Sequence, residues 1–357
     1  MQPHKTLLIM AGGTGGHVFP ALAVAKEMAK DGWNIHWLGT AAGIESRLVP
    51  EAGYPLHCLN IAGVRGNGLA RLVGAPFKIL RAILQAKKII KKIKPNAVLG
   101  FGGYATGPGG VAAKLSGVPL LIHEQNAVAG LTNKLLSPMA NVIMQGFPNT
   151  LKNALFVGNP VREEVAQIAA PEVRLHASGK LKVLVVGGSL GAKALNETIF
   201  TAMQMLPEEA RPELMHQVGK THFELMQQSY SQAQIAAQVL AFIDDMASSY
   251  AWADLVICRA GALTVAEIAA AGCAALFVPF PHAVDDHQSA NARYLADQQA
   301  ALLVQQSALN AEKIIQLWQH YAAQKQELLA MASKARGLAI NTATQAVANQ
   351  VKEVSRG

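Results

Sequence analysis

The chain has 357 residues, of which 51% are hydrophobic and 15% are charged, and its net charge is +8. This composition excludes a disordered chain, and the length fits two domains. Three scattered cysteines are too few for a disulfide framework or a zinc knuckle, which favours a reducing cytoplasm. The N-terminal apolar run is broken by glycines, and no stretch of about 18 apolar residues follows, so we expect neither a signal peptide nor a membrane span.

Positive charge is concentrated in the first half of the chain. Residues 1–160 contain 16 Lys/Arg and five Asp/Glu, whereas residues 161–357 contain 15 and 18. Residues 52–123 contain ten Lys/Arg and neither Asp nor Glu. Such a local excess favours an anionic membrane surface, an acidic small molecule or nucleic acid as a partner, with simple solubility as the alternative. Nucleic acid is not expected, because an RNP-like aromatic pair and a helix-turn-helix pattern are both missing from the sequence.

Short apolar runs alternate with helical segments along the whole chain. These runs are Leu7–Met10, Val98–Leu99, Leu120–His123, Val142–Met144, Val183–Val186, Val239–Phe242, Leu255–Cys258 and Ala275–Val278. Runs of this length, bounded by Gly or Pro and separated by helices, predict an α/β fold with parallel sheets. Residues 6–17 and 182–192 repeat the same order of strand, glycine pair and helix, which indicates a duplicated architecture. We expect the boundary within 158–174 and a linker around 167–180.

Three glycine-rich loops follow predicted strands, at residues 12–17, 102–107 and 187–191. A glycine turn that opens a helix lets free backbone N–H groups approach an oxyanion. None of the loops has the spacing of a dinucleotide fingerprint or of a P-loop. Three such loops in one chain therefore favour a polyphosphate or sugar-phosphate ligand, bound at the carboxyl ends of the strands.

A basic amphipathic helix is predicted between Pro76 and Pro95, with its start at the first proline. At about 100° per residue, one stripe would pack on a sheet. It comprises Ile79, Ile83, Ala86, Ile90 and Ile93. A second apolar patch with positive neighbours would face outward, and comprises Phe77, Leu80, Arg81, Leu84, Lys87 and Lys88. This second patch suits an anionic lipid surface, the alternatives being a helix buried on two sides or a dimer contact.

Two later segments gather polar side chains. Glu267 follows the glycine of residues 259–267, where a carboxylate could accept ribose hydroxyls or could simply lie on a solvated helix face. In residues 279–288, two acids beside two histidines raise the possibility of a metal site, but their spacing disfavours it. Sugar-hydroxyl recognition by His287, Gln288 and Asn291 is the favoured interpretation.

Seven segments together resemble the MurG family of bacterial cell-wall glycosyltransferases. They are GGTGGHVFPALAVA (12–25), FGGYATGPGGVAA (101–113), HEQNAVAGLTNK (123–134), VGNPVR (157–162), GGSLGAKALN (187–196), CRAGALTVAE (258–267) and DDHQSANA (285–292). The resemblance implies a glycosyltransferase B-type fold, in which two Rossmann-like domains face each other across a cleft. It implies an acceptor and membrane-facing domain of residues 1–162 with the C-terminal helix 338–357, and a donor-binding domain of residues 163–337.

The resemblance also implies the reaction and its partners. N-acetylglucosamine would pass, with inversion, from UDP-N-acetylglucosamine to the muramyl 4-hydroxyl of lipid I, the undecaprenyl-diphosphate-linked acceptor, giving lipid II. The enzyme would sit peripherally on the cytoplasmic face of the inner membrane, in contact with anionic phospholipid, and could meet cell-wall synthesis or division proteins. We expect no cofactor and no protein-bound metal, and the sequence leaves open whether a divalent cation assists the diphosphate.

The residues implied to contact UDP-N-acetylglucosamine are Thr14, Gly15, Gly16, His17, Asn126, Arg162, Ser189, Gly191, Ala192, Ile243, Leu263, Thr264, Glu267, His287, Gln288 and Asn291. Ser189 and the amides of Gly191 and Ala192 would hold the diphosphate. Loops for the acceptor pyrophosphate would contain Gly13, Gly102, Gly103 and Tyr104. Some relatives carry Gln where this chain has His287, which leaves the partner of one sugar hydroxyl open.

His17 is the first candidate for the general base, since the ordinary pKa of histidine suits proton transfer near neutrality. Its alternative role is structural, capping the glycine loop or binding the acceptor pyrophosphate, and Glu124 is the second candidate base. Two other functions compete with the transferase. A UDP-N-acetylglucosamine 2-epimerase-like isomerase would need no lipid-facing helix, and a non-catalytic nucleotide-sugar or lipid-binding protein would not need the full set of donor positions.

Overall fold

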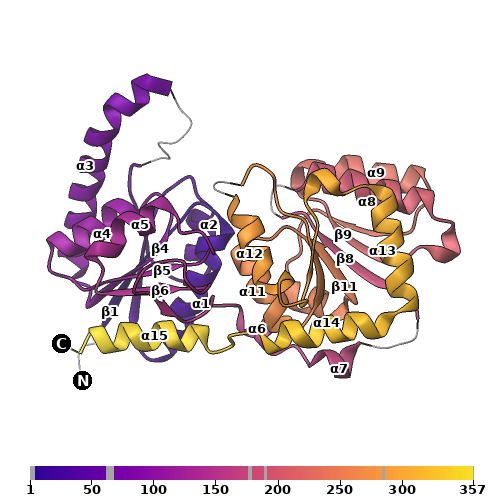
Figure 1. Cartoon of the computed structure of the whole chain (residues 1–357). Helices are drawn as coiled ribbons and strands as arrows, with labels where there is room; N and C mark the ends of the chain where they lie inside the picture. The colour runs from indigo at the N-terminus through magenta and orange to yellow at the C-terminus, as the bar shows by residue number, and fades with distance from the viewer. Residues whose placement is uncertain (1–4, 62–67, 176–178, 189–190, 284–285, 357) are drawn as a thin grey trace. The chain divides into compact units, whose positions relative to one another are not determined.

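The computed structural model describes residues 5–61, 68–175, 179–188, 191–283 and 286–356, and gives residues 68–75 as helix without their side chains. The chain forms two compact units (Figure 1). Unit 1 comprises Met1–Arg162 and Ile340–Gly357, and unit 2 comprises Glu163–Ala339. The expected boundary after residue 162 coincides with that of the units, and the chain returns to unit 1 at residue 340 rather than 338.

Unit 1 contains a parallel sheet with the strand order β3-β2-β1-β4-β5-β6-β7 in the part of the chain that the structure describes. Its strands are β1 (Thr6–Ala11), β2 (Asn34–Gly39), β3 (Leu56–Cys58), β4 (Ala97–Gly102), β5 (Leu120–Glu124), β6 (Val142–Gln145) and β7 (Leu155–Phe156). The sequence predicts β1, β4, β5 and β6 but misses the other three. Strands β3 and β7 are short strands at the edges of the sheet, and His36 interrupts the apolar residues of β2. None of the three therefore gives a continuous apolar run that a sequence pattern could reveal.

Helices cover both faces of this sheet, as expected for a doubly wound fold. They are α1 (Gly15–Lys30), α2 (Glu45–Glu51), α3 (Gly68–Ile93), α4 (Thr106–Leu115), α5 (Leu131–Leu136) and α15 (Ala343–Val354). Val347 and Val351 of α15 share a core cluster with Val18 of α1, so the C-terminal helix closes one face of the sheet (Figure 1). The other face carries α3 and α4, whose Ala86 and Ala112 pack in a second cluster.

Helix α3 differs from its prediction in two respects. It begins at Gly68, so Pro76 lies inside the helix and does not start it. Ile79, expected in the core stripe, is 38% exposed, whereas Ala82 and Ala86 are fully buried. The physical reason is that the N-terminal part of α3 extends beyond the rest of unit 1 (Figure 1), so only its C-terminal part meets the sheet.

Unit 2 repeats the strand order of unit 1, with β10-β9-β8-β11-β12-β13 among its described residues. Its strands are β8 (Lys182–Val186), β9 (Glu213–Gln217), β10 (Gln238–Leu240), β11 (Leu255–Cys258), β12 (Ala274–Phe277) and β13 (Leu302–Leu303). Its helices are α6 (Glu163–Ala166), α7 (Pro171–Arg174), α8 (Lys193–Met205), α9 (Phe223–Gln232), α10 (Met246–Trp252), α11 (Ala262–Ala271), α12 (His287–Ala296), α13 (Ala311–Ala323) and α14 (Lys325–Gly337). Strands β1 and β8 hold equivalent central positions, so the predicted duplication is confirmed.

The prediction of a linker around residues 167–180 is wrong for residues 167–175 and 179–180, the part of this range that the structure describes. Pro171 starts the short helix α7, and Arg174 at its end lies against the end of helix α11. The Arg174 guanidinium donates to the backbone oxygens of Ala253 and Ala271, at 3.3 and 3.2 Å. Proline at a first helical position and an arginine that satisfies carbonyl groups tie this segment into unit 2.

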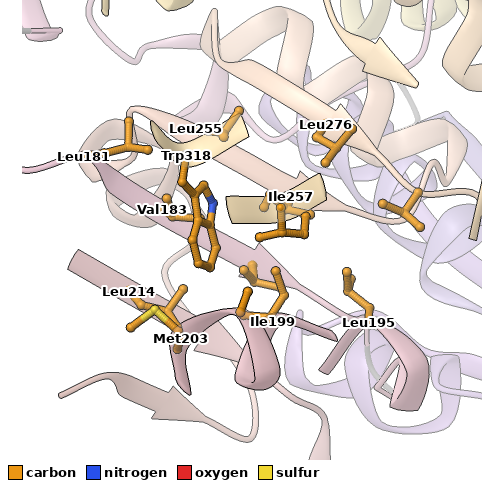
Figure 2. Packing of buried hydrophobic residues seen from close by; sticks show 14 of the residues in the cluster. Leu181, Val183, Leu195, Ile199, Met203, Leu214, Leu255, Ile257, Leu276 and Trp318 are labelled. Atoms are coloured by element: carbon orange, nitrogen blue, oxygen red, sulfur yellow. The ribbon is translucent and has the colours of Figure 1, made fainter. Parts of the chain in front are cut away.

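The core of unit 2 gives a stability prediction with a matched control. Leu276 of β12 is fully buried among the side chains drawn in Figure 2, whereas Leu225 of α9 is 63% exposed. Leu276→Ala should lower the free energy of unfolding by about 2–5 kcal/mol, because it leaves a cavity. Leu225→Ala should change it by less than about 0.5 kcal/mol. Urea denaturation of the two variants measures the difference, and equal values would contradict the assigned core.

Candidate active site

The predicted glycine loops lie at the carboxyl ends of the central strands in both units. In unit 1 they follow β1 and β4, which are neighbours in the sheet, and in unit 2 the loop follows β8. Parallel strands bring their carboxyl ends to one edge, which is where open α/β sheets bind ligands. Each unit therefore gathers its own set of loop amides and polar side chains.

The two glycine loops of unit 1 contact each other, and glycine is required at the contact. A Cβ at Gly103 would lie 2.5 Å from the Gly12 carbonyl oxygen, and a Cβ at Gly102 would lie 3.0 Å from Cε1 of His17. Gly102 and Gly103 also have φ angles of +106° and +90°, which disfavour other residues. The structure thus brings His17 and the predicted pyrophosphate loops together, with the Tyr104 side chain exposed beside them.

A carboxylate that was not predicted from the sequence lies beneath the first loop. Glu45 is fully buried, and its Oε2 accepts a hydrogen bond from Gly13 N–H at 2.9 Å. Its Oε1 accepts from the Thr40 N–H and hydroxyl, at 2.9 and 2.8 Å. Glu45 therefore fixes the loop that carries Thr14, Gly15 and Gly16. Its glycine-rich surroundings, residues 39–43, were the only signal in the sequence.

A chain of hydrogen bonds connects His17 with the interior of unit 1. Nδ1 of His17 lies 2.8 Å from Oε1 of Gln125, and Nε2 of Gln125 lies 3.0 Å from Nδ1 of His123. Nε2 of His123 lies 2.9 Å from the Gly158 carbonyl oxygen. Burial lowers the pKa of His123 to about 4, so this ring is neutral near pH 7. Gln125 was not a predicted site residue, although it directly follows strand β5.

Glu124, the second candidate base, is buried and accepts several hydrogen bonds. Its Oε1 accepts from the Asn126 N–H at 2.9 Å and from the Asn126 side chain at 3.3 Å. Its Oε2 accepts from Gly130 N–H at 3.0 Å and from Asn133 Nδ2 at 2.9 Å. A carboxylate held in this way shapes the loop after β5 and fixes the position of Asn126, an expected sugar contact. This geometry favours His17 over Glu124 as the base.

The loop of unit 2 is also held by a side chain that was not predicted from the sequence. Gln217, at the end of β9, accepts from Gly188 N–H at 3.0 Å and donates to the carbonyl oxygens of Gly188 and Ala241, at 3.1 and 3.0 Å. It thereby joins the glycine loop to the segment of Ile243, which is buried. A polar residue at the end of a strand could have been the signal, but strand β9 was not among the predicted strands.

The predicted diphosphate contacts lie at the start of helix α8. Ser189 lies outside the described residues. Gly191 N–H donates to the Gly188 carbonyl oxygen at 2.9 Å, so this amide already closes a turn. Ala192 is the N-cap of α8, and no side chain caps the helix among the residues that the structure describes. The first N–H groups of a helix lack intrahelical acceptors, so α8 offers them to an anion.

Helix α11 presents a second uncapped N-terminus, at Gly261, within the described chain. Leu263 and Thr264 are the second and third residues of this helix, where amides have no intrahelical acceptor. Glu267 is buried and accepts a hydrogen bond from the Tyr250 hydroxyl at 3.3 Å, so the alternative of a solvated helix face is wrong. Its burial beside an open helix start suits recognition of ribose hydroxyls.

The other residues predicted to contact UDP-N-acetylglucosamine differ in what their side chains contact. The Asn291 side chain donates to the Ala260 carbonyl oxygen at 3.1 Å and so supports the loop before α11. Gln288 accepts from Phe280 N–H at 2.9 Å, and partly buried His287 is the first residue of α12. Arg162 ends the first segment of unit 1, and its Cζ lies 5.7 Å from the ring centre of Phe19. In the described part of the chain, no group of three or more His, Cys, Asp or Glu side chains could hold a metal ion.

Two buried histidines make the stability of the chain depend on pH. Burial lowers the pKa of His123 to about 4 and that of His216, in unit 2, to about 3. The histidines of the unfolded chain bind protons near pH 6.5, whereas those of the folded chain do not. The contribution of these two residues to the free energy of unfolding is therefore fully present above pH 6.5 and decreases as the pH falls below it. Each histidine should cost about 2 kcal/mol of unfolding free energy at pH 5. Urea denaturation at pH 7 and pH 5 measures this loss. The variant His216→Asn should lose about 2 kcal/mol less between the two pH values, and an equal loss would contradict the assignment.

The predicted lipid-facing residues of α3 project from unit 1. Phe77, Leu80 and Leu84 are 77%, 54% and 53% exposed. Arg81, Lys87 and Lys88 are exposed on the same helix. The alternative of a helix buried on two sides within this chain is therefore wrong. Among the described helices, none combines the length and the apolar character needed to span a membrane.

Comparisons with known proteins match both units. The glycosyltransferase family 28 N-terminal domain matches residues 7–145, and the glycosyltransferase family 28 C-terminal domain matches residues 182–351. The crystal structure of Acinetobacter baumannii MurG is similar with a TM-score of 0.83 and 48% identity, covering 98% of this chain and 99% of that one. The calicheamicin glycosyltransferase CalG4, at 13% identity and a TM-score of 0.68, shares the fold, with 98% of each chain covered.

Curated relatives agree with this match. The chain is 50% identical over 353 residues to the UDP-N-acetylglucosamine–N-acetylmuramyl-(pentapeptide) pyrophosphoryl-undecaprenol N-acetylglucosamine transferase of Dechloromonas aromatica strain RCB, covering 99% of each. It is 52% identical over 354 residues to the protein of the same name from Ectopseudomonas mendocina strain ymp, covering 98% of this chain and 99% of the relative. These similarities confirm the glycosyltransferase B-type fold class of two Rossmann-like units. The chain thus belongs to glycosyltransferase family 28 and, within it, to the MurG family of N-acetylglucosamine transferases.

Proposed function

We propose that this chain transfers N-acetylglucosamine from UDP-N-acetylglucosamine to the 4-hydroxyl of the muramyl sugar of lipid I, giving lipid II for peptidoglycan synthesis. The observation that carries the proposal is an identity of 50% or more, over 98–99% of the chain, with transferases named for this reaction. The similarity extends across both units, so it includes the glycine loops of each.

Unit 2 binds the donor in this proposal. The helix starts of α8 and α11 direct backbone N–H groups toward the diphosphate, while Glu267 takes the ribose hydroxyls. Fixed dipoles aimed at the leaving group stabilise negative charge as it develops, without a protein-bound metal or a cofactor. Gln217 holds the glycine loop in place, so the loop needs little reorganisation when the diphosphate arrives.

Unit 1 binds the acceptor and supplies the base. The muramyl 4-hydroxyl oxygen forms the new bond to the anomeric carbon, with inversion. The bond from that carbon to the diphosphate oxygen breaks, and its electron pair leaves with UDP. The hydroxyl proton passes to Nε2 of His17, since Nδ1 is engaged by Gln125. The Gly102–Gly103 turn and the loop after Gly13, whose own N–H is held by Glu45, receive the acceptor pyrophosphate.

The lipid-linked acceptor explains the exposed face of α3. Apolar side chains surrounded by arginine and lysine match an anionic leaflet better than a neutral protein surface, because the charges attract phospholipid headgroups. The chain accordingly sits peripherally on the cytoplasmic face of the inner membrane, next to its substrate. Contact with other cell-wall synthesis or division proteins stays a prediction.

A single assay tests the reaction. The chain is incubated with radiolabelled UDP-N-acetylglucosamine and a short-chain analogue of lipid I. A labelled disaccharide lipid together with released UDP is the expected result. A 2-epimer of the sugar would instead indicate an isomerase, and binding of the nucleotide without any product would indicate a binding protein. Either of these outcomes would overturn the proposal.

A further inference from the structure

The hydrogen bonds around His123 determine which atom donates and which accepts in each hydrogen bond between Gly158 and His17. A carbonyl oxygen can only accept, so the proton of His123 lies on Nε2 and is donated to Gly158. Because the buried ring is neutral near pH 7, its Nδ1 carries a lone pair and accepts. The group that faces this Nδ1 must therefore be a donor.

The side chain of Gln125 supplies that donor and can adopt only one orientation. Its Nε2 lies 3.0 Å from Nδ1 of His123 and 2.8 Å from the His123 carbonyl oxygen, so both amide hydrogens have acceptors. The flipped amide would place its oxygen against two acceptors. Consequently Oε1 of Gln125 faces His17 and can only accept, at 2.8 Å, and Nδ1 of His17 must carry the proton.

We propose that Gln125 is a positioning residue for the transfer: it holds neutral His17 as the Nδ1–H tautomer, leaving the lone pair on Nε2. Gly102 leaves room for the same ring, since a Cβ there would lie only 3.0 Å from Cε1 of His17. A triad aspartate does the same for its histidine but adds a negative charge. The neutral amide orients the ring without placing a further anion beside substrates that carry diphosphates. The role of the lone pair as base rests on the proposed function, whereas the tautomer does not.

The tautomer can be measured without turnover. Nitrogen NMR of the full chain labelled with ¹⁵N-histidine, with His17 assigned from the loss of its signals in His17→Gln, distinguishes a protonated ring nitrogen from an unprotonated one. At a pH where His17 is neutral, we expect Nδ1–H in the wild type. Gln125→Leu should shift His17 toward a mixture of tautomers, because it removes the acceptor that faces Nδ1 of His17. An Nε2–H tautomer in the wild type, or no change in Gln125→Leu, would overturn the proposal.

Activity provides a second readout. Gln125→Leu should lower kcat by about 10–100-fold with little change in the KM for the donor, as for other residues that orient a reacting group. Gln145→Leu is the matched control, since Gln145 is equally buried but accepts from Thr150 N–H and Leu151 N–H instead. The control should leave the His17 tautomer unchanged. A wild type that shows Nδ1–H but no transfer would contradict the proposed function and leave the tautomer assignment standing.

Discussion

His17→Ala is expected to lower kcat for the transfer by about 10²–10⁴-fold, the usual contribution of a general base. The affinity for UDP-N-acetylglucosamine should hardly change, because the proposed donor contacts of the diphosphate and ribose come from unit 2. The imidazole lies at the contact of the two glycine loops of unit 1, whereas the nearby Glu45 carboxylate is buried and accepts from the loop backbone. Without it, the attacking hydroxyl must lose its proton to water.

Steady-state kinetics and equilibrium binding of UDP-N-acetylglucosamine separate the two roles considered for His17. A base affects kcat, whereas a side chain that binds the acceptor pyrophosphate affects the KM for the acceptor. His320→Ala is the control, because His320 is an exposed histidine of α13 that pairs with Glu327. A normal kcat in His17→Ala would remove His17 from the chemistry, and a raised acceptor KM with normal kcat would assign it to binding.

The double substitution Leu80→Glu with Leu84→Glu is expected to reduce binding to anionic vesicles by more than about 100-fold. Inserting a leucine side chain into an apolar phase is worth about 1.5–3 kcal/mol, so the loss of two costs about 3 kcal/mol or more. Two added negative charges also oppose an anionic surface. Sedimentation with vesicles that contain phosphatidylglycerol measures the partition coefficient.

A matched pair of substitutions controls for the added charge. Met205 and Leu225 of unit 2 are 52% and 63% exposed, so Met205→Glu with Leu225→Glu changes two similar apolar side chains elsewhere on the chain. This control should bind vesicles with at most a small loss. Lys87→Gln with Lys88→Gln should weaken binding by about 1 kcal/mol per charge, and only when anionic lipid is present. If Leu80→Glu with Leu84→Glu sediments like the wild type, α3 does not dock on lipid.

Much of the candidate site could be predicted because its parts are local in the sequence. The residues after β1, β4, β8 and β11 combine an apolar run with glycine, and that pattern specifies a strand, a tight turn and the start of a helix. The repeated order of these patterns in residues 6–17 and 182–192 likewise predicted two related sheets. The edge strands β3 and β7 were not predicted, because a strand of two or three residues is too short to show a hydrophobic period.

The supports of these loops became visible only in three dimensions. Glu45, Gln125 and Gln217 lie on other segments of the chain, and their hydrogen bonds reach the loops across 32, 108 and 29 residues. The burial of a side chain also depends on residues that are distant in the sequence. Glu267, which the sequence allowed on a solvated helix face, is buried, whereas Ile79 of α3, which was expected in the core, is 38% exposed. Sequence periodicity describes neighbours along one helix or strand, whereas tertiary packing decides which distant polar group completes a loop. The sequence by itself therefore determined the two sheets and their glycine turns, and the tertiary structure decided which side chains hold those turns in place.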